Sequence, residues 1–329
     1  MKPLLHRRRA LGAIAALALC SATQAASWPD KPISVIVPAP AGSSLDQNVR
    51  RVAEEMAKLL KQTLIIENRP GGGGAIALSA VARATPDGYA LGIGNTASMV
   101  ITPEINSKVS YDPLKDFELI GRFTHQPNVL VVKNDLPVKT VAELTQHLKK
   151  NPGKLFLGSQ GNGSSGHLSG ELYKKLSAVD FVHVPYRGGP LAVQDMLGGR
   201  LDLMFENMAT IESHIEAGKV RALAVTSAKR NPRFPALPTM QEAGVAGYEV
   251  VTWAGLIAPA GTPKEVVARL NEVLNAALSV HEVKTFILGR GAVIDGGSPA
   301  GFKTFVAGER TKWRALIKDI GGIGEEPAR

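Results

Sequence analysis

Apolar positions along this chain alternate between short runs and longer segments in which they recur every three or four residues. Short apolar runs bounded by turn residues predict buried strands, and the longer segments predict amphipathic helices. In the first third of the chain the two kinds alternate, with strands predicted at 33–37, 64–66 and 90–94 and helices at 49–60 and 75–84. This order predicts a parallel sheet whose strands are joined by right-handed helical crossovers.

The same alternation restarts at residue 129. Strands are predicted at 129–132, 155–157, 181–184, 201–205, 220–226 and 253–258, and helices at 141–148, 167–176, 191–197, 211–217 and 299–317. Thr262-Pro263-Lys264-Glu265 predicts a further helix that opens with a capping box and has proline at its first position. Two α/β units joined near 122–128 and near 245–253 would account for the pattern. We therefore expect one domain from 27–124 with 250–329, and a second from 125–249.

The first 26 residues follow the pattern of an export signal. A basic start is followed by an apolar stretch at 10–20 and by small, polar residues at 21–26. This is the layout of a secretory signal peptide cleaved after Ala25 or Ala26, which predicts a periplasmic protein. Two other interpretations stay open: a lipobox that ends at Cys20, and a twin-arginine signal around Arg8 and Arg9.

The composition is that of a soluble globular chain. The 329 residues are 44% hydrophobic and 20% charged, which excludes a fibre, a coiled coil or a disordered tail. Cleavage after Ala25 removes four basic residues and no acidic ones, so the formal net charge falls from +9 to +5. It also removes the only cysteine, and the fold must therefore be stabilised by its core. The basic residues are scattered, which argues against a nucleic-acid site and leaves a mild positive field that favours small anions.

Five polar or glycine-rich loops directly follow predicted strands. They lie at 38–46, 94–98, 158–166, 185–189 and 206–210. In a parallel α/β sheet such loops gather at the carboxyl edge of the strands, where ligands bind. Two of them, at 41–44 and 159–165, run into helix N-termini, whose free amides and positive dipole end attract an anion. The alternative is that glycine here only permits turns and serine only caps helices.

Motifs for other chemistry are incomplete. The sequence Gly161-Asn162-Gly163-Ser164-Ser165-Gly166 matches a dinucleotide-binding pattern, but Pro185-Tyr186-Arg187 stands where the required acidic residue would follow the next strand. The run Gly71–Gly74 is not followed by the lysine of a phosphate-binding loop, and no nucleophile elbow of a hydrolase occurs. We expect neither a cofactor nor a catalytic residue.

A few polar side chains have two interpretations each. His167 and Glu171 lie one helical turn apart and suit a shared metal, but no third ligand has a recognisable spacing, so a surface pair or an anion-holding histidine is the alternative. His183, within an apolar strand, is expected to be structural. Glu206 and Asn207, just after a strand, suit either a ligand contact or a helix cap.

Motifs along the whole chain after residue 26 occur together in a characteristic order. They include Trp28-Pro29-Asp30-Lys31-Pro32-Ile33, Glu67-Asn68-Arg69-Pro70-Gly71, Pro86-Asp87-Gly88-Tyr89, the loops at 37–46 and 159–167, His183-Val184-Pro185-Tyr186-Arg187-Gly188 and Ala258-Pro259-Ala260-Gly261-Thr262-Pro263. In this order they resemble the Bug extracytoplasmic solute receptors, the substrate-binding proteins of tripartite tricarboxylate transporters. The resemblance implies a two-domain α/β fold like that of periplasmic binding proteins. Each domain would be a mainly parallel sheet flanked by helices, and the two would close like a Venus flytrap around a small carboxylate.

The resemblance also implies the ligand-binding residues. The loop after the first strand and the Gly/Ser loop of the second domain would pinch the carboxylate through backbone groups and waters. The predicted ligand-binding residues are Ala41, Gly42, Ser43, Ser44, Asp46, Asn95, Ser159, Gly161, Asn162, Gly163, Ser164, Ser165, His167, Tyr186 and Glu206. Leu45 replaces a residue that is often small and polar in the family, which favours a less polar pocket and leaves aromatic or longer-chain carboxylates as open as citrate.

The implied function is capture of a small organic anion and its delivery to the membrane subunits of a tripartite transporter by a monomeric receptor. Two alternatives stay open. One keeps the fold and makes the protein a ligand sensor for a signalling partner. The other is an exported enzyme that uses His167 and Glu171.

Overall fold

The chain folds into a mixed sheet that helices cover on both faces. The computed structural model describes residues 28–186, 188–319 and 321–322, so the predicted export signal lies outside the described residues. The strands are β1 (Ile33–Val37), β2 (Leu64–Asn68), β3 (Ala90–Asn95), β4 (Phe117–Val132), β5 (Phe156–Ser159), β6 (Val182–Pro185), β7 (Leu203–Asn207), β8 (Arg221–Val225), β9 (Val251–Pro259) and β10 (Val293–Ile294). The helical segments are α2 (Ser44–Leu60), η2 (Gly72–Gly74), α3 (Ala75–Ala82), η3 (Ala97–Ile101), α4 (Thr102–Ile105), α5 (Val141–Lys150), α6 (Ser165–Ser177), α7 (Gly189–Leu197), α8 (Met208–Glu216), α9 (Lys264–Ser279), α10 (His281–Leu288) and α11 (Pro299–Asp319).

The strand order explains why the sheet is mixed. Its path is β2-β1-β3-β9-β4-β7-β5-β6, with β8 and β10 also paired to β4. Strand β1 runs parallel to β2 and β3, and β5 runs parallel to β6 and β7, as the helical crossovers require. The central strands β4 and β9 run antiparallel to their neighbours. The α/β fold class that we predicted is therefore confirmed, with two antiparallel strands in its middle.

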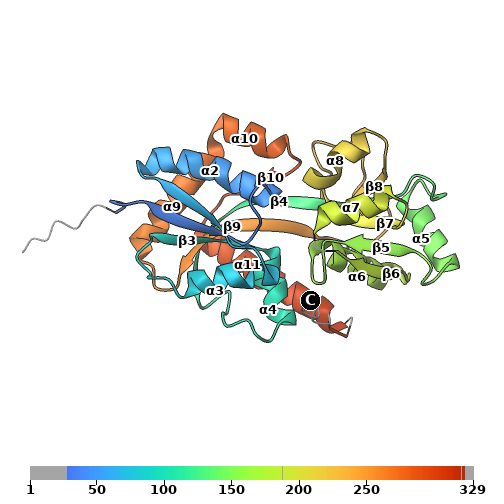
Figure 1. The fold of residues 1–329 in the computed structure, drawn as a ribbon, viewed down its shortest axis with the longest axis horizontal. Helices are drawn as coiled ribbons and strands as arrows, with labels where there is room; N and C mark the ends of the chain where they lie inside the picture. The colour runs from blue at the N-terminus through green and yellow to red at the C-terminus, as the bar shows by residue number, and fades with distance from the viewer. Residues whose placement is uncertain (1–27, 187, 320, 323–329) are drawn as a thin grey trace, which may run out of the picture.

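Strand β4 passes through both parts of the sheet, as Figure 1 shows. Up to Pro127 it pairs with β9, and from Asn128 onward it pairs with β7. We call residues 28–127 and 251–319 the first lobe and residues 128–250 the second lobe. The register of β4 shifts at three places close to this change of partner, between 119 and 121, 122 and 124, and 130 and 131. Where we predicted a junction near 122–128, the chain continues as a strand.

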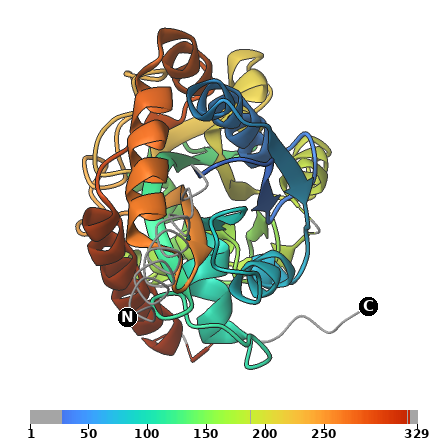
Figure 2. The ribbon, with the colours of Figure 1, turned by 90° about the vertical axis from the view of Figure 1, so that its left-hand side faces the viewer.

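Alternate residues of the central strands pack against different layers of helices. In the first lobe, Val35 of β1 lies in a cluster with α2, α9 and α10, whereas Ile36 points to the side of α3 and α11. Figure 2 shows this lobe end-on, with α2 and α10 above the sheet and α3 and α4 below it. In the second lobe, Val131 of β4 packs against α7 and α8, and Leu130 packs on the side of α5 and α6. Burial of both faces explains the uninterrupted apolar runs.

Some elements differ from the sequence prediction. The capping box predicted at Thr262 is wrong, because its hydroxyl donates to Pro259 O at 2.8 Å and Pro263 is the N-cap of α9, without a side-chain cap. The helical segments η3, α4 and α10 were not predicted. None of the helices in the described residues is both long and apolar enough to cross a lipid bilayer.

Candidate functional site

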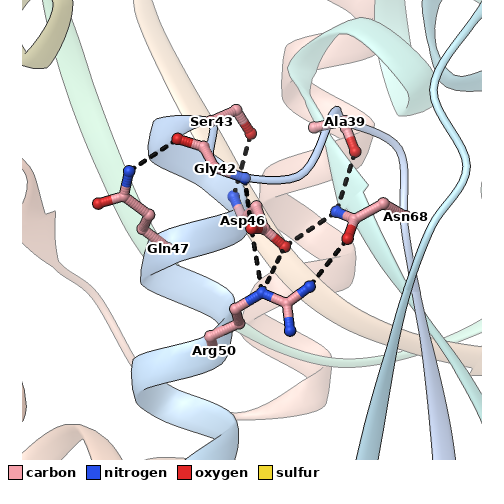
Figure 3. Close-up of polar contacts among 7 residues, drawn as sticks. All are labelled: Ala39, Gly42, Ser43, Asp46, Gln47, Arg50 and Asn68. Carbon is pink, nitrogen blue, oxygen red and sulfur yellow. Dashed lines mark hydrogen bonds and ion pairs between the residues drawn. The ribbon is translucent and has the colours of Figure 1, made fainter.

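The loop between β1 and α2 is held in place by the carboxylate of Asp46, as Figure 3 shows. Asp46 is only 2% exposed, and its oxygens accept hydrogen bonds from Gly42 N at 2.8 Å and Asn68 Nδ2 at 2.9 Å. Arg50 Nε lies 3.0 Å from both oxygens. Burial raises the pKa of Asp46, but the hydrogen bonds from Arg50, Asn68 and Gly42 outweigh it and lower the pKa overall. The carboxylate is therefore ionised and fully engaged within the loop.

The same loop caps helix α2. Ser43 is the N-cap, with φ −66° and ψ 161°, and its hydroxyl accepts a hydrogen bond from Asp46 N at 3.3 Å. Gly42, directly before it, has φ +78°, a conformation that glycine adopts without strain. Ser43 N donates to Pro40 O at 3.2 Å, which closes the turn.

The Gly/Ser loop before α6 repeats this arrangement. Ser164 is the N-cap, with φ −67° and ψ 161°, and its hydroxyl accepts from His167 N at 3.3 Å. Gly163 has φ +71°, and its amide donates to His167 Nδ1 at 3.1 Å. Ser164 N donates to Gly161 O at 3.1 Å. The equivalent positions of the two loops are 40 and 161, 41 and 162, 42 and 163, 43 and 164, 44 and 165, 45 and 166, and 46 and 167.

Each loop leaves main-chain amides at a helix N-terminus without a partner. Among the described residues, no acceptor lies in hydrogen-bond range of the amides of Ala41, Ser44 and Leu45 in the first loop, or of Asn162 and Ser165 in the second. The amides of Ser44, Leu45 and Ser165 belong to first helical turns, where the helix dipole is positive, and those of Ala41 and Asn162 stand two residues before the N-caps. The amides of Gly42 and Gly163 are already engaged, so these glycines shape the loops.

Contacts through helix η3 bring the two loops into one region. Gly74 leaves room for Pro38, at the start of the first loop, and for Ser98 of η3, because a Cβ at Gly74 would lie 3.1 Å and 2.7 Å from their Cβ atoms. Gly163 packs against Ile105 of α4, which directly follows η3, because a Cβ at Gly163 would lie 2.5 Å from Ile105 Cδ1. The segment 97–105 is therefore near Pro38 at its start and in contact with Gly163 of the second-lobe loop.

Two stacked histidines lie behind the Gly/Ser loop. The rings of His167 and His183 are 3.8 Å apart between centroids, and their planes differ by 4°. His183 Nε2 lies 2.7 Å from Ser159 Oγ, which also bonds the backbone of Gly161. Burial lowers the pKa of His167 to about 4 and that of His183 to about 3, with smaller contributions from the charge of Lys174. Both rings are therefore neutral at pH 7, and His183 is structural, as predicted.

Glu206 lies at the carboxyl end of β7, beneath the start of α7. Its side chain is 0% exposed, and its Oε1 accepts a hydrogen bond from Asn207 N at 2.8 Å. Its Oε2 is buried and has no partner among the described residues. A Cβ at Gly189 would lie 2.7 Å from this oxygen. Burial raises the pKa of Glu206 to about 7, although the hydrogen bond from Asn207 N acts against it.

Other predicted residues have their polar groups engaged within the protein. The hydroxyl of Tyr186 donates to Asp195 Oδ2 at 2.7 Å, and burial together with this bond raises its pKa to about 12. Asn95 Oδ1 accepts from Ser98 N at 2.9 Å and so fixes the turn into η3. Leu45 packs against the hydrophobic cluster of the first lobe. The assignment of Tyr186 and Asn95 to ligand binding, and the less polar pocket expected from Leu45, stay predictions.

Several residues that shape the site were missed by the sequence reasoning. Gln160 joins the Gly/Ser loop to β7, since its Oε1 accepts from Gly166 N and its Nε2 donates to Phe205 O, both at 3.1 Å. Arg50 and Asn68 hold Asp46 in the first loop. Only Asn68 had a signal in the sequence, because it belongs to the motif Glu67-Asn68-Arg69-Pro70-Gly71.

The geometry of His167 bears on the metal and enzyme interpretations. Its Nδ1 is already an acceptor for Gly163 N, and its Nε2 lies 3.9 Å from Glu171 Oε1. Glu171 is also 3.3 Å from Lys174 Nζ. Within the part of the chain that the structure describes, no three His, Cys, Asp or Glu side chains are grouped as a metal site would require.

Comparison with known proteins connects this arrangement to solute receptors. Residues 48–322 match the model of the family described as "Tripartite tricarboxylate transporter family receptor". A protein of Pseudomonas sp. strain P51, described as "UPF0065 protein in tcbD-tcbE intergenic region", is 36% identical, and the alignment covers 94% of each chain.

Two solved structures from Rhodopseudomonas palustris are similar. Rpa4515 with adipate is 36% identical, with a TM-score of 0.82 and 90% of this chain and 99% of that chain covered. MatC with bound malate is 32% identical, with a TM-score of 0.78 and coverages of 88% and 100%.

Proposed function

This chain belongs to the tripartite tricarboxylate transporter family of receptors, and we propose that it captures a small organic carboxylate in the periplasm and delivers it to the membrane subunits of such a transporter. Members of this family with 32–36% identity to this chain have been solved with adipate and with malate. Both are dicarboxylates, so a dicarboxylate is the proposed ligand class. The basic net charge that remains after cleavage of the signal would favour capture of such anions.

One observation carries the proposal: the two lobes present matching helix N-terminal loops with unpaired amides. The loops at 40–46 and 161–167 have the same N-cap geometry. Pro38, just before the first, lies with Ser98 against Gly74, and Gly163 of the second packs against Ile105. An anion between them would receive hydrogen bonds from both lobes and would face the positive ends of α2 and α6.

The proposed mechanism is a shift between open and closed arrangements of the lobes. A ligand that contacts both loops binds the closed arrangement better and increases its population, and the transporter recognises that arrangement. The crossing strands β4 and β9 are the proposed hinge, because β4 changes partner between Pro127 and Asn128 and its register shifts on both sides of that point. Irregular ladder positions bend more easily than a continuous one.

Calorimetry of the protein without residues 1–26 tests the binding step. We expect stoichiometric binding of adipate or malate and no binding of adipamide, which has the length of adipate but no charge. The bound acid should be recovered unchanged after release. Absence of binding across a panel of dicarboxylates, tricarboxylates and aromatic acids, or chemical conversion of the bound acid, would contradict the proposal.

Delivery and export need separate measurements. Sequencing the N-terminus of protein recovered from the periplasm should show cleavage after Ala25 or Ala26. Reconstituted transporter subunits should take up the acid only when the loaded receptor is present. Capture of a histidine kinase in place of transporter subunits would favour the sensor alternative.

A further inference from the structure

The loop before α2 and the Gly/Ser loop before α6 each hold a glycine amide with a side chain of the following helix, but the two side chains differ. In the first loop the amide of Gly42 donates to Asp46 at 2.8 Å, and in the second the amide of Gly163 donates to His167 Nδ1 at 3.1 Å. Both acceptors are the third residue of their helix, and both backbone segments have nearly the same dihedral angles. We propose that His167 is the positioning residue of the second ligand loop, equivalent to Asp46 in the first, and that protonation of its imidazole releases this loop and lowers ligand affinity.

The residues one turn further along each helix support this equivalence. In α2 that position is Arg50, which neutralises the carboxylate of Asp46 at 3.0 Å. In α6 it is Glu171, whose Oε1 lies 3.9 Å from His167 Nε2. The order of acid and base is therefore reversed: the acid Asp46 is followed one turn later by a base, whereas the base His167 is followed one turn later by an acid. A neutral imidazole adds no charge at the positive end of α6, just as the ion pair of Asp46 and Arg50 adds no net charge at that of α2.

The hydrogen bond from Gly163 fixes the tautomer of His167. A nitrogen that accepts a hydrogen bond carries no proton, so the proton of the neutral ring is on Nε2, facing Glu171. Protonation would place an N–H on Nδ1, opposite the N–H of Gly163, and two donors cannot bond each other. The loop would lose the bond that holds Gly163 at φ +71°.

The charged groups around His167 oppose its protonation at neutral pH. Burial of the ring disfavours an imidazolium most, and Lys174, on the same helix, is a cation that adds to this effect, whereas the stacked His183 is neutral. Glu171 is the one described acid close to the ring, and it is shared with Lys174 at 3.3 Å. Ile105, which packs on Gly163 from the first lobe, is uncharged. Protonation therefore takes place only in acid, where the new N–H on Nδ1 would face the N–H of Gly163 and the hydrogen bond to the loop would be lost.

This inference rests on the proposed function, and its experiment separates acceptor geometry from mere packing. Adipate is the probe, measured by calorimetry at pH 7.5 with wild type, His167→Asn and His167→Leu. Asparagine carries the acceptor Oδ1 on its Cγ, and histidine carries Nδ1 on the same atom. Leucine fills the space without an acceptor. We expect His167→Asn to bind within about threefold of wild type and His167→Leu to bind roughly tenfold more weakly, because an unsatisfied amide is costly. Equal affinities of the two variants would overturn the positioning role.

A pH profile tests the release. Between pH 7.5 and pH 3.5, a range that spans the lowered pKa of His167 of about 4, the affinity of wild type should fall more than that of His167→Asn, since titration of adipate itself affects both proteins alike. Parallel profiles would overturn the proposal. An independent measurement uses ligand-free wild type: a long-range ¹H–¹⁵N spectrum at pH 7.5 should show His167 protonated at Nε2, and a proton on Nδ1 would refute the inference. If wild type binds neither adipate nor malate, the proposed function fails, whereas the tautomer measurement still decides the inference.

Discussion

Gly163 of the second lobe packs against Ile105 of the first lobe so closely that a side chain at Gly163 has no space. A Cβ there would lie 2.5 Å from Ile105 Cδ1 and 3.3 Å from Ile101 Cγ2. Gly42, its equivalent in the first loop, has a similar positive φ but no atom within 4 Å of an added Cβ. The two glycines therefore share a backbone requirement and differ in their contact with the opposite lobe.

This difference predicts unequal effects of the same substitution. Gly42→Ala should cost only the strain of alanine at positive φ, about 1 kcal/mol of unfolding free energy. Gly163→Ala should cost the same strain and also push Ile105 away, which disturbs the approach of the lobes. We expect Gly163→Ala to weaken adipate binding at least about fivefold more than Gly42→Ala does, since each 1.4 kcal/mol is tenfold. Calorimetry and urea unfolding of both variants check this.

The double variant Gly163→Ala/Ile105→Ala is the matched control. Truncation of Ile105 removes the clash but not the backbone strain, so it should restore affinity toward that of Gly42→Ala. If the double variant binds no better than Gly163→Ala, the loss does not arise at the contact between the lobes.

Much of the fold could be predicted because local patterns determine it. The run 33–37, apolar at four of its five positions, predicted the bounds of β1 correctly. The Gly-Ser pairs at 42–43 and 163–164 indicated helix N-termini there, whereas apolar periodicity placed the first residues of these helices later, at 49 and 167 instead of 44 and 165. The crossing part of β4 was missed because its sequence around Gly121 and Pro127 resembles a junction, and proline is rare within a sheet. Only the pairing with β9 on one side shows that the segment continues as a strand.

The candidate site could be predicted as a set of loops but not as a set of contacts. Glycine and serine before a helix indicate an N-cap, whichever side chain then holds the glycine amide. The roles of Asp46 and His167 depend on their rotamers, which the sequence does not encode locally. The contact between Gly163 and Ile105 joins segments far apart in the chain, so no local pattern contains it.

The buried histidines predict a loss of stability in acid. Burial lowers the pKa of His167 from 6.5 to about 4, so between these values the unfolded chain binds a proton that the folded protein does not. The free energy of unfolding should therefore fall as the pH decreases from 6.5 to 4, by up to about 1.4 kcal/mol per pH unit for this group. It should not depend on this group above pH 6.5. Urea unfolding followed by tryptophan fluorescence across this range measures the slope.

His167→Asn is the control for this slope. The variant lacks the titrating ring but keeps an acceptor for Gly163, so its stability should decline less steeply between pH 6.5 and 4. His183 is stacked on His167, whose charge also lowers its pKa, so the difference in slope reports the coupled pair of rings. Identical slopes would mean that His167 is solvated enough to titrate as in the unfolded chain.

The buried carboxyl group of Glu206 should make the free energy of unfolding fall as the pH rises, the opposite of the effect of His167. Burial raises the pKa of Glu206 from 4.5 to about 7, so the folded protein keeps a proton that the unfolded chain loses between these values. Stability should fall as the pH rises from 4.5 to 7. Glu206→Gln removes this cost and keeps the shape, so at pH 8 it should be more stable than wild type by about 1–3 kcal/mol, and less so at pH 5. A variant less stable than wild type at pH 8 would show that the ionised carboxylate has a partner that the fold needs.

Ser164 offers a test in which stability and affinity change in opposite directions. Its hydroxyl accepts from His167 N at 3.3 Å as the N-cap of α6, and both aspartate and asparagine are strong N-cap residues. Ser164→Asp adds a negative charge at the positive end of the helix, which should stabilise the protein by up to about 1 kcal/mol. The same charge lies where the ligand carboxylate is proposed to bind, so adipate affinity should fall at least about tenfold. Ser164→Asn preserves the cap without the charge and should bind within about threefold of wild type. Calorimetry and thermal unfolding separate these effects, because a change in packing alone would lower stability and affinity together. If Ser164→Asp binds adipate as tightly as Ser164→Asn, the carboxylate does not lie at the N-terminus of α6.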